Sequence, residues 1–455
     1  MAGSPRPPPA WDHKFKQTRI AIIGTGLAGL TTAHLLSRSS RSSNYSIHLF
    51  EAGPKIGFDA HSLVVDGRVV DVPMRAVTSG YYPRLMGLYR SLGVKLRRVR
   101  FSYSFSDGNG VRLTYGGGSG RRGVRASSIW ETLITSLTFI YFAILATLYT
   151  YLLPPSMALS TTTLDTFLQT HHFPTSFSRN YLFPLFSAIC TCSHSTTLRL
   201  PASEVLRYAA ASLWGKHCVV EGGVRVVRRR LMEGIEEGNV HLGRGVERIR
   251  RANEKVKIKL EGCDDEEEFD HVVFAVGAAQ ARRILSSSSS STKQDADTDN
   301  DAHEHKHGDL VRLLDAFESE KVEVITHRDT TILPASPTHL RTLNLSSHSS
   351  TNQTSTTHIL APTLLQTTNP TPTHTHTIPS PLLLGRAQFY RGIQTLESLE
   401  AVRELEGVQG WDGVWFVGSW TRKGLVLLEG CVEGAEGVVQ GILAQENARR
   451  DGGKA

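Results

Sequence analysis

Six consecutive residues near the start of the chain have the types and spacing of a phosphate-binding turn. They place glycine at Gly24, Gly26 and Gly29. The first glycine permits a tight turn, the second lets the backbone approach a diphosphate, and the third lets a helix pack closely on a strand. At the start of that helix, the N–H groups of Leu27 and Ala28 would face the phosphates. The chemistry that this pattern predicts is dinucleotide binding.

The segments around this turn are those that a dinucleotide site needs. The apolar segment Arg19–Ile23 predicts a strand that enters the turn, and Leu27–Ser37 predicts the helix that leaves it. A second predicted strand, Ile47–Glu51, ends on a carboxylate 22 residues after Gly29. An acidic residue at about this spacing accepts hydrogen bonds from ribose hydroxyls. The turn alone is a weak signal in a chain with 40 glycines, but this setting makes it specific.

The bulk composition fits a globular protein and disfavours several other classes. The 455 residues are 40% hydrophobic and 20% charged, which suffices for two joined domains. The net charge of +7 is spread over short clusters, so no nucleic-acid partner is expected. The five cysteines are few and odd in number, and Cys190 and Cys192 lack the companions of a metal site. We expect reduced thiols and no metal in an intracellular protein, either cytoplasmic or membrane-associated.

Stretches at both ends of the chain resemble the flavin-containing amine oxidase superfamily. Ile20–Glu51, with the following Gly53–Gly57, is similar to its opening segment, and the match is closest to a branch of uncharacterised NAD/FAD-binding oxidoreductases. Trp415–Arg422 resembles that branch's strand and turn beside the flavin, and Leu428–Ala435 resembles the helix that meets the isoalloxazine ring. The resemblance implies that the cofactor is FAD.

The resemblance also implies a set of cofactor-binding residues. To the three glycines, Leu27, Ala28 and Glu51 it adds Lys55, Val246, Gly418, Ser419, Glu429 and Gly430. A helix N-terminus aimed at a flavin carbonyl would stabilise negative charge on the reduced ring. No catalytic acid or base is assigned, because flavin hydride chemistry often needs none.

The implied fold is α/β, a Rossmann-like FAD-binding domain with an inserted α+β substrate domain, as in amine oxidases and GDP-dissociation inhibitors. The FAD-binding domain is expected to comprise residues 15–75, 215–285 and 385–447, and the substrate domain 76–214 and 309–384. Residues 1–14 and two low-complexity insertions, 286–308 and 346–377, are expected to be mostly disordered because they are too polar to offset their ordering entropy. Within the second insertion, Ile359–Gln366 has the pattern of a strand.

Three positions depart from the family pattern. Lys55 stands where an arginine is usual, and it lacks the bidentate fork of a guanidinium. Phe58 replaces a glycine that lets the backbone come close to the cofactor. These two changes predict weaker FAD binding at a site that is retained. Leu427 occupies an aromatic position of the cage around the amine in monoamine oxidases, which counts against a classical amine oxidase.

The longest apolar run, Thr132–Leu153, has 22 residues without a charge and follows Arg121, Arg122 and Arg125. It is long enough to span a membrane. However, the flavin segments before and after it must meet at one FAD, and a single crossing would separate them. Three interpretations stay open: a helix buried in the substrate domain, an anchor in one leaflet, or a span paired with a weaker second one.

The sequence therefore predicts an FAD-dependent oxidoreductase that removes a hydride from a lipophilic small molecule. Oxidase, dehydrogenase and desaturase activities all fit, and a membrane surface is one expected place of action. Two alternatives remain. One is a non-catalytic protein of the same fold that binds lipidated or prenylated partners, and the other is an amine oxidase.

Overall fold

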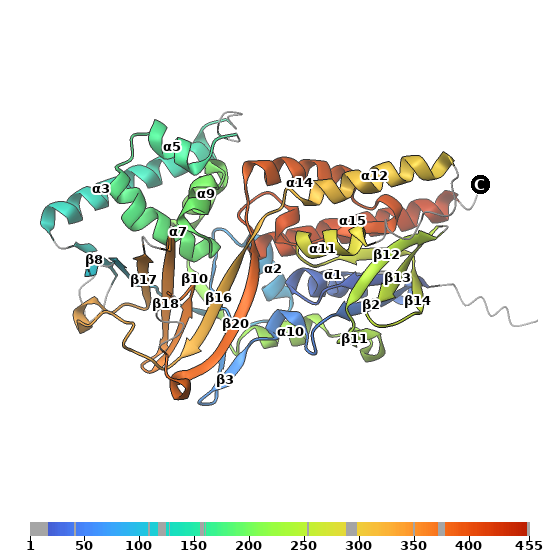
Figure 1. Ribbon diagram of the computed structural model, residues 1–455, viewed down its shortest axis with the longest axis horizontal. Coiled ribbons are helices and arrows are strands. Elements are labelled where there is room, and N and C mark those ends of the chain that lie inside the picture. Colours follow the sequence, from blue (N-terminus) through green and yellow to red (C-terminus); the bar gives the residue numbers. More distant parts are fainter. Residues whose placement is uncertain are drawn as a thin grey trace, which may run out of the picture.

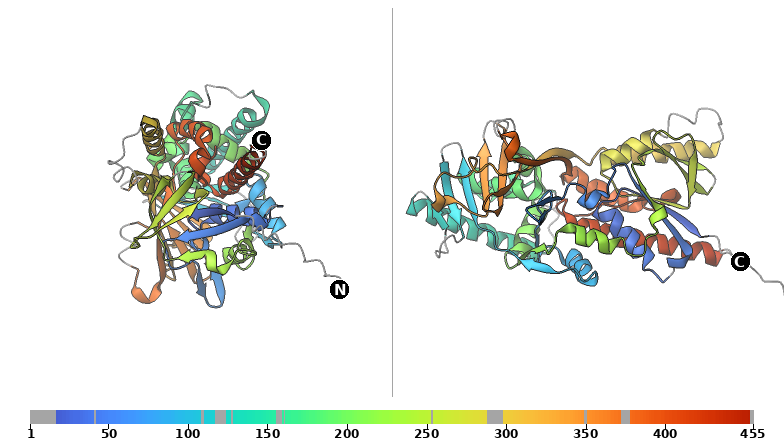
Figure 2. Two further views of the ribbon diagram at one scale, coloured as in Figure 1. Left: turned by 90° about the vertical axis from the view of Figure 1, so that its right-hand side faces the viewer. Right: turned by 90° about the horizontal axis from the view of Figure 1, so that it is seen from below.

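The computed structural model describes residues 17–452 except 41, 108–109, 117–123, 127, 155–158, 160, 253, 288–297, 349–350 and 372–377. Two domains lie end to end along its long axis (Figure 1). The dinucleotide domain is built on a five-stranded sheet, and the inserted domain is built on an eight-stranded sheet with helices on one side. The view from below shows the same division (Figure 2).

The sheet of the dinucleotide domain is parallel, in the order β11-β2-β1-β15-β21. Its central strands are buried on both faces, which explains their nearly continuous apolar sequence. The strands are β1 (Thr18–Ile23), β2 (Tyr45–Glu51), β11 (Val240–Leu242), β15 (His271–Phe274) and β21 (Val414–Phe416).

Each face of this sheet has its own hydrophobic core. One core is formed by helices α1 (Leu27–Ser37), α2 (Pro83–Ser91), α10 (Val224–Leu231) and α15 (Leu428–Gly452). The other contains helices α11 (Ala278–Ser286), α12 (Thr298–Leu314) and α14 (Leu396–Val408) with the meander β12 (Val246–Ala252), β13 (Lys255–Leu260) and β14 (Glu266–Phe269). A small sheet flanks the first core and consists of β5 (Val77–Thr78), β6 (Leu96–Arg98) and β10 (His217–Val220). The hairpin of β3 (Leu63–Val65) and β4 (Arg68–Val70) packs instead on the eight-stranded sheet.

The inserted domain is a mixed sheet covered by helices. Its strand order is β20-β16-β19-β18-β17-β7-β8-β9, with β17 parallel to β7 and the other pairs antiparallel. The strands are β7 (Tyr103–Asp107), β8 (Gly110–Tyr115), β9 (Val124–Ala126), β16 (Ser319–His327), β17 (Leu343–His348), β18 (Gln353–Ala361), β19 (Leu364–Thr368) and β20 (Leu383–Gly392). The principal helices are α3 (Ile129–Thr147), α5 (Leu164–Thr170), α7 (Phe183–Cys190), α8 (His194–Arg199) and α9 (Ala202–Ser212).

Three expected domain boundaries are displaced in the structure. Residues 76–98 were expected in the substrate domain, but α2 packs on α15 in the first core of the dinucleotide domain. Helix α12 packs on α11 and α14, so the dinucleotide domain also includes residues beyond 309. Residues 385–392 were expected in the FAD-binding domain, but they pair with β16 in the eight-stranded sheet. Long-range pairing, which local sequence patterns do not encode, decides each of these boundaries.

The expectation of disorder in 346–377 is wrong for most of that segment, because 353–361 and 364–368 form two inner strands. Their threonine-rich side chains are buried yet hydrogen-bonded: Thr357 contacts Thr367 at 2.9 Å, and Thr354 contacts His194 at 2.7 Å. Threonine is a good strand former, and these partners satisfy its hydroxyl group. In the first insertion, 298–307 belongs to helix α12, whereas 288–297 and 1–14 lie outside the described residues.

The apolar run forms α3 and a following turn of π-helix, Leu148–Leu152. One face packs on α9 through Phe142, Leu145 and Ala146. The opposite face is open, with Ile134 57% and Ile140 56% exposed. The interpretation of a helix buried in the substrate domain is therefore wrong. Within the described part of the chain, this is the one helix long and apolar enough to cross a membrane.

Candidate functional site

The glycine-rich turn joins β1 to α1 beneath the loop that follows β15. Gly24 has φ +103°, and a methyl group there would lie 2.6 Å from the carbonyl oxygen of Ala275. A methyl group at Gly29 would collide with the carbonyl oxygen of Gly24. At Gly26, in contrast, it would meet no atom within 4 Å. Gly24 and Gly29 thus allow close backbone packing, whereas Gly26 borders open space.

That open space belongs to a cavity of about 480 Å³ at the carboxyl ends of the strands. Its lining includes three residues of the turn (Gly24, Thr25 and Gly26), Glu51 at the end of β2, and five residues that follow β11 or β15 in the chain: Arg244, Val246, Gly277, Gln280 and Arg283. The crevice at the carboxyl ends of parallel strands is where α/β folds bind ligands. Sequence reasoning found Val246 but missed Arg244, Gln280 and Arg283, which lie in loops and a helix with no motif of their own.

Two helix N-termini border this cavity. Gly26 caps α1 and Gly277 caps α11, and neither cap makes a side-chain hydrogen bond. The space beside Gly277 is as open as that beside Gly26. The first N–H groups of a helix have no partner within the helix, and its dipole favours a negative ligand. The cavity therefore has the donor groups that a diphosphate needs.

Two acids line the cavity, Glu51 and Glu261, and Glu51 is the one at the end of β2. Its Oε2 accepts hydrogen bonds from the N–H and the hydroxyl of Thr25, and its Oε1 accepts one from Gly53 N–H at 2.9 Å. These bonds fix the carboxylate at the end of β2, as expected for a ribose-binding acid. Glu51 consequently also joins the glycine-rich turn to the loop after β2.

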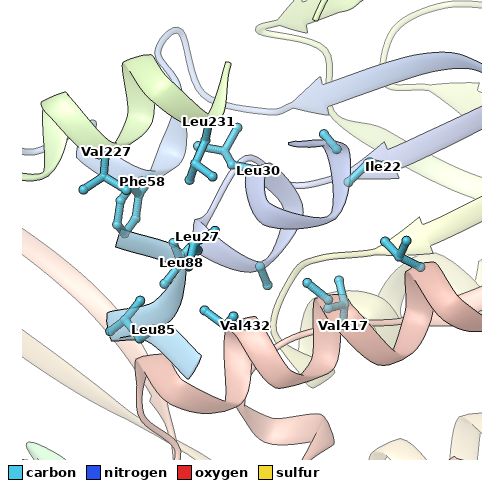
Figure 3. Packing of buried hydrophobic residues seen from close by; sticks show 14 of the residues in the cluster. Ile22, Leu27, Leu30, Phe58, Leu85, Leu88, Val227, Leu231, Val417 and Val432 are labelled. Carbon is cyan, nitrogen blue, oxygen red and sulfur yellow. The ribbon is translucent and has the colours of Figure 1, made fainter. Parts of the chain in front are cut away.

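Lys55 and Phe58 lie on the loop that was expected to contact the cofactor. Lys55 is exposed and does not line the cavity. The ring of Phe58 points into the core beside Leu27, Leu88 and Val227 (Figure 3). Since that ring packs away from the cavity, the glycine-to-phenylalanine change leaves the diphosphate space open. The Phe58 N–H bonds to Thr25 O at 3.1 Å and thus holds the loop against the turn.

The C-terminal motif reaches the same edge of the sheet. Strand β21 pairs with β15, and Trp420 donates from Nε1 to Val276 O at 3.0 Å, one residue from the Ala275 that Gly24 contacts. Both flavin-like segments therefore meet at the loop after β15. A methyl group at Gly430 would lie 3.0 Å from Ser419, so this glycine lets α15 pack on the turn after β21. Gly418, Ser419 and Gly430 do not line the 480 Å³ cavity.

Glu429 has a different role from the one expected. Its two carboxylate oxygens accept hydrogen bonds from the backbone N–H groups of Arg84 (2.8 Å) and Leu85 (3.0 Å). These are the second and third residues of α2, so Glu429 caps that helix from a distant part of the chain. Burial raises the pKa of the carboxyl group, while the two N–H groups oppose this effect. We assign Glu429 to positioning α2 and α15 rather than to the cofactor.

Fold and cavity define a class: a two-domain protein that binds a dinucleotide at the carboxyl edge of a parallel sheet. The family model "flavin containing amine oxidoreductase" matches residues 27–300. The chain belongs to this family and is an FAD-dependent oxidoreductase. This membership decides against the non-catalytic alternative. The residues present fit FAD, because two helix N-termini, open glycines and a fixed carboxylate surround one cavity.

Solved structures share the fold at low identity. A protein assigned as a protoporphyrinogen oxidase from Exiguobacterium sp. 255-15 matches with a TM-score of 0.64 at 17% identity, over 94% of this chain and 99% of that one. A fatty acid isomerase from P. acnes, which produces CLA, has a TM-score of 0.64 at 16% identity (93% and 98% covered). Cyclohexylamine oxidase from Brevibacterium oxydans has a TM-score of 0.64 at 13% identity (95% and 100% covered). No curated protein matches the chain by sequence.

FAD, when bound, supplies the hydride acceptor for the oxidation of a substrate. Gly26, Leu27 and Ala28 would hold its diphosphate, and Glu51 would hold its ribose. The residues of the inserted domain would then orient the substrate and exclude water.

Proposed function

We propose that this oxidoreductase removes a hydride from a lipophilic small molecule that it takes up at a membrane surface through α3. The observation that carries the proposal is the open apolar face of α3, which includes Leu133, Ile134, Leu137, Ile140, Tyr141 and Ile144, together with Trp130 at its start. Exposed apolar patches of this kind mark surfaces for membranes or partners.

The fold disfavours a single membrane crossing by this helix. Segments before and after α3, β1 and β21, both flank β15 in one sheet. One folded sheet lies on one side of a bilayer, so a helix between its strands enters and leaves from that side. A helix that enters one leaflet only with its open apolar face satisfies this constraint. Arg121 and Arg122, which precede α3, lie outside the described residues; basic residues at this place would favour an anionic headgroup surface.

A lipophilic substrate is consistent with this location. Helix α3 packs on α9, and α9 carries Tyr208, which packs against the cores of both domains. The P. acnes relative is a fatty acid isomerase, so the fold accommodates an apolar chain in at least one protein. A classical amine substrate is disfavoured because position 427, beside the C-terminal motif, has the aliphatic side chain of Leu427 and not an aromatic ring.

Vesicle flotation tests the membrane part of the proposal. The wild-type protein is expected to float with vesicles of phosphatidylcholine and phosphatidylserine, and Ile134→Glu and Ile140→Glu should each weaken this binding about tenfold or more. Each change removes an apolar side chain whose burial contributes about 1.5–3 kcal/mol. Val64→Glu is the matched control, since Val64 is 66% exposed but lies on the β3–β4 hairpin.

The two parts of the proposal have separate readouts. Equal flotation of both α3 variants and the wild type would refute the membrane contact. Anaerobic bleaching of the bound flavin by lipophilic extracts tests the substrate class. If only water-soluble amines bleached the flavin, the lipophilic substrate would be refuted and the amine oxidase alternative supported.

A further inference from the structure

Four basic residues gather at one end of the small sheet β5-β10-β6. Arg97 and Arg98 belong to β6, which is an edge strand of this sheet, and Arg100 follows β6 by two residues. Lys216 immediately precedes β10. All four residues are exposed, and none of them forms a salt bridge with the part of the chain that the structure describes. We call these four residues the basic patch.

Backbone pairing places two of these charges opposite each other. The N–H of Val99 donates to His217 O at 2.9 Å, which extends the antiparallel pairing of β6 with β10 by one position. The next residues in this register are Arg100 and Lys216. Like charges directly opposite each other destabilise a sheet, and the acid of this strand pair, Glu221, lies at its other end. An anionic ligand at the basic patch would relieve this repulsion.

An exposed tryptophan borders the basic patch. Trp214 lies between α9 and Lys216 and is 91% exposed, and Leu213 beside it is 45% exposed. The turn that carries them is fixed to Ser79, because the N–H of Lys216 donates to Ser79 Oγ at 3.0 Å and the N–H of Ser79 donates to Lys216 O at 3.1 Å. The fold therefore holds a large, mainly apolar side chain in water next to a group of cations, which is unfavourable unless a ligand or surface covers it.

Protection of the sheet edge explains part of this pattern but not all of it. Charged residues on an edge strand hinder its pairing with other chains, and this role fits Arg97 and Arg98. An exposed Trp214 has the opposite effect, because it adds an apolar group to the same surface. Basic side chains beside tryptophan suit the boundary layer of a bilayer, where tryptophan is enriched and cations meet anionic headgroups.

The basic patch lies on the same side of the molecule as α3. Helix α9 packs on α3, and the chain continues directly from α9 into Leu213 and Trp214. In Figure 2, α3 and the light blue segment 83–98 both lie along the right-hand edge of the left view and along the lower edge of the right view. A bilayer surface that meets the open face of α3 is therefore within reach of the basic patch.

We propose that the basic patch and Trp214 bind the anionic headgroup layer of the bilayer that α3 enters. This proposal rests on the proposed function, because it assumes that α3 contacts a membrane. It adds a second, electrostatic contact and a preference for anionic lipids. A single contact leaves the protein free to tilt on the surface, whereas two separate contacts fix which side of the molecule faces the bilayer.

Vesicle sedimentation tests this contact with the purified FAD-loaded protein. The two kinds of vesicle are phosphatidylcholine alone and phosphatidylcholine mixed with phosphatidylserine. The triple variant Arg97→Gln, Arg98→Gln and Arg100→Gln should bind the mixed vesicles about 100-fold more weakly than the wild type, since each cation near an anionic surface contributes about fivefold. Its binding to phosphatidylcholine alone should be unchanged. Added salt should weaken wild-type binding to the mixed vesicles, because it screens exposed charges.

A second triple variant, Arg68→Gln, Arg225→Gln and Arg403→Gln, is the matched control. These arginines are also exposed and lie on β4, α10 and α14, outside the basic patch. The control has the same change in net charge and should bind the mixed vesicles like the wild type. Both triple variants should keep the wild-type midpoint of urea unfolding, because all six residues are exposed.

Trp214 has a readout of its own. Brominated lipids quench the fluorescence of a tryptophan that enters the bilayer, so the wild type should lose more fluorescence on mixed vesicles than Trp214→Phe does. Equal quenching of the two proteins would overturn the assignment of Trp214 to the membrane contact.

The outcomes separate this proposal from the function on which it rests. Equal binding of the patch variant and the wild type to mixed vesicles would overturn the headgroup contact and leave an acidic protein partner or edge protection as the role of the patch. Equal losses in the patch variant and the control would also overturn it, because total charge would then be responsible. If Ile134→Glu bound like the wild type while the patch variant bound weakly, the α3 contact would fail and the headgroup contact would be supported. A wild type that bound neither kind of vesicle would refute both.

Discussion

Replacing Gly26 by valine should abolish FAD binding while leaving the fold intact. The open space beside Gly26 lies at the N-terminus of α1, where the N–H groups of Leu27 and Ala28 are available to a diphosphate. A valine side chain would occupy this space and separate the phosphates from both groups. Two hydrogen bonds to a charged ligand contribute about 3–6 kcal/mol, so the affinity should fall by roughly 10²- to 10⁴-fold.

The stability of the apo-protein should change little, because the Cβ atom of the new side chain would meet no atom within 4 Å. Gly26 has φ −69°, which other residues adopt freely. The helix cap weakens by about 1 kcal/mol, and the smaller entropy of the unfolded chain offsets part of that loss. In the comparison variant Gly29→Ala, the methyl group would collide with Gly24 O, so the apo-protein should lose about 1–3 kcal/mol or more.

Titration of apo-protein with FAD, followed by flavin fluorescence, measures the affinity of each variant, and urea unfolding measures its stability. The reasoning requires Gly26→Val to lose affinity without stability and Gly29→Ala to lose stability. If Gly26→Val bound FAD like the wild type, the diphosphate would not lie beside Gly26, and our assignment of the cavity would be wrong.

Three further results are expected. Glu51→Ala should weaken FAD binding about 10- to 100-fold and also destabilise the apo-protein, since two backbone N–H groups lose their acceptor; unchanged stability by urea unfolding would contradict the second part. Glu429→Ala should cost about 1–2 kcal/mol of stability by removing the cap of α2, with FAD affinity in titrations unchanged; the opposite pattern would return Glu429 to the cofactor site. Burial, followed by the nearby charge of Arg19, lowers the pKa of His48 to about 4 in the folded protein. The unfolded chain therefore takes up a proton at His48 below about pH 6.5, whereas the folded protein takes it up only below about pH 4. Stability should therefore fall by roughly 3 kcal/mol across this window on account of His48, and His48→Gln should show a shallower fall in pH-dependent unfolding.

The sequence determined the dinucleotide half of the molecule well, because its signals are local. The strand, the glycine turn, the helix and the strand ending in Glu51 follow one another within 34 residues, from Thr18 to Glu51. The backbone conformation at Gly24 and the cap at Gly26 are properties of that short segment. The hairpin Leu63–Val70 has the same local character.

The prediction of disorder from composition was wrong where tertiary contacts supply hydrogen-bond partners for polar side chains. The threonine-rich segment 353–368 is polar enough to suggest disorder, yet it forms inner strands of the larger sheet. Gln366, within it, donates to Asp71 O at 3.0 Å and so connects the inserted sheet to the loop after β4. A hydroxyl or amide is unfavourable in the interior only until it finds a partner, and that partner lies far away in sequence.

Only the tertiary structure decided which charged groups already have partners. In sequence, Glu429 lies within a segment that resembles a flavin contact. In the fold, it caps a helix that begins some 345 residues earlier. Likewise, only the fold shows that the helix formed by the apolar run Thr132–Leu153 packs through one face and leaves the opposite face open. The sequence specifies the chemistry of a side chain, but its availability depends on the groups that long-range folding places around it.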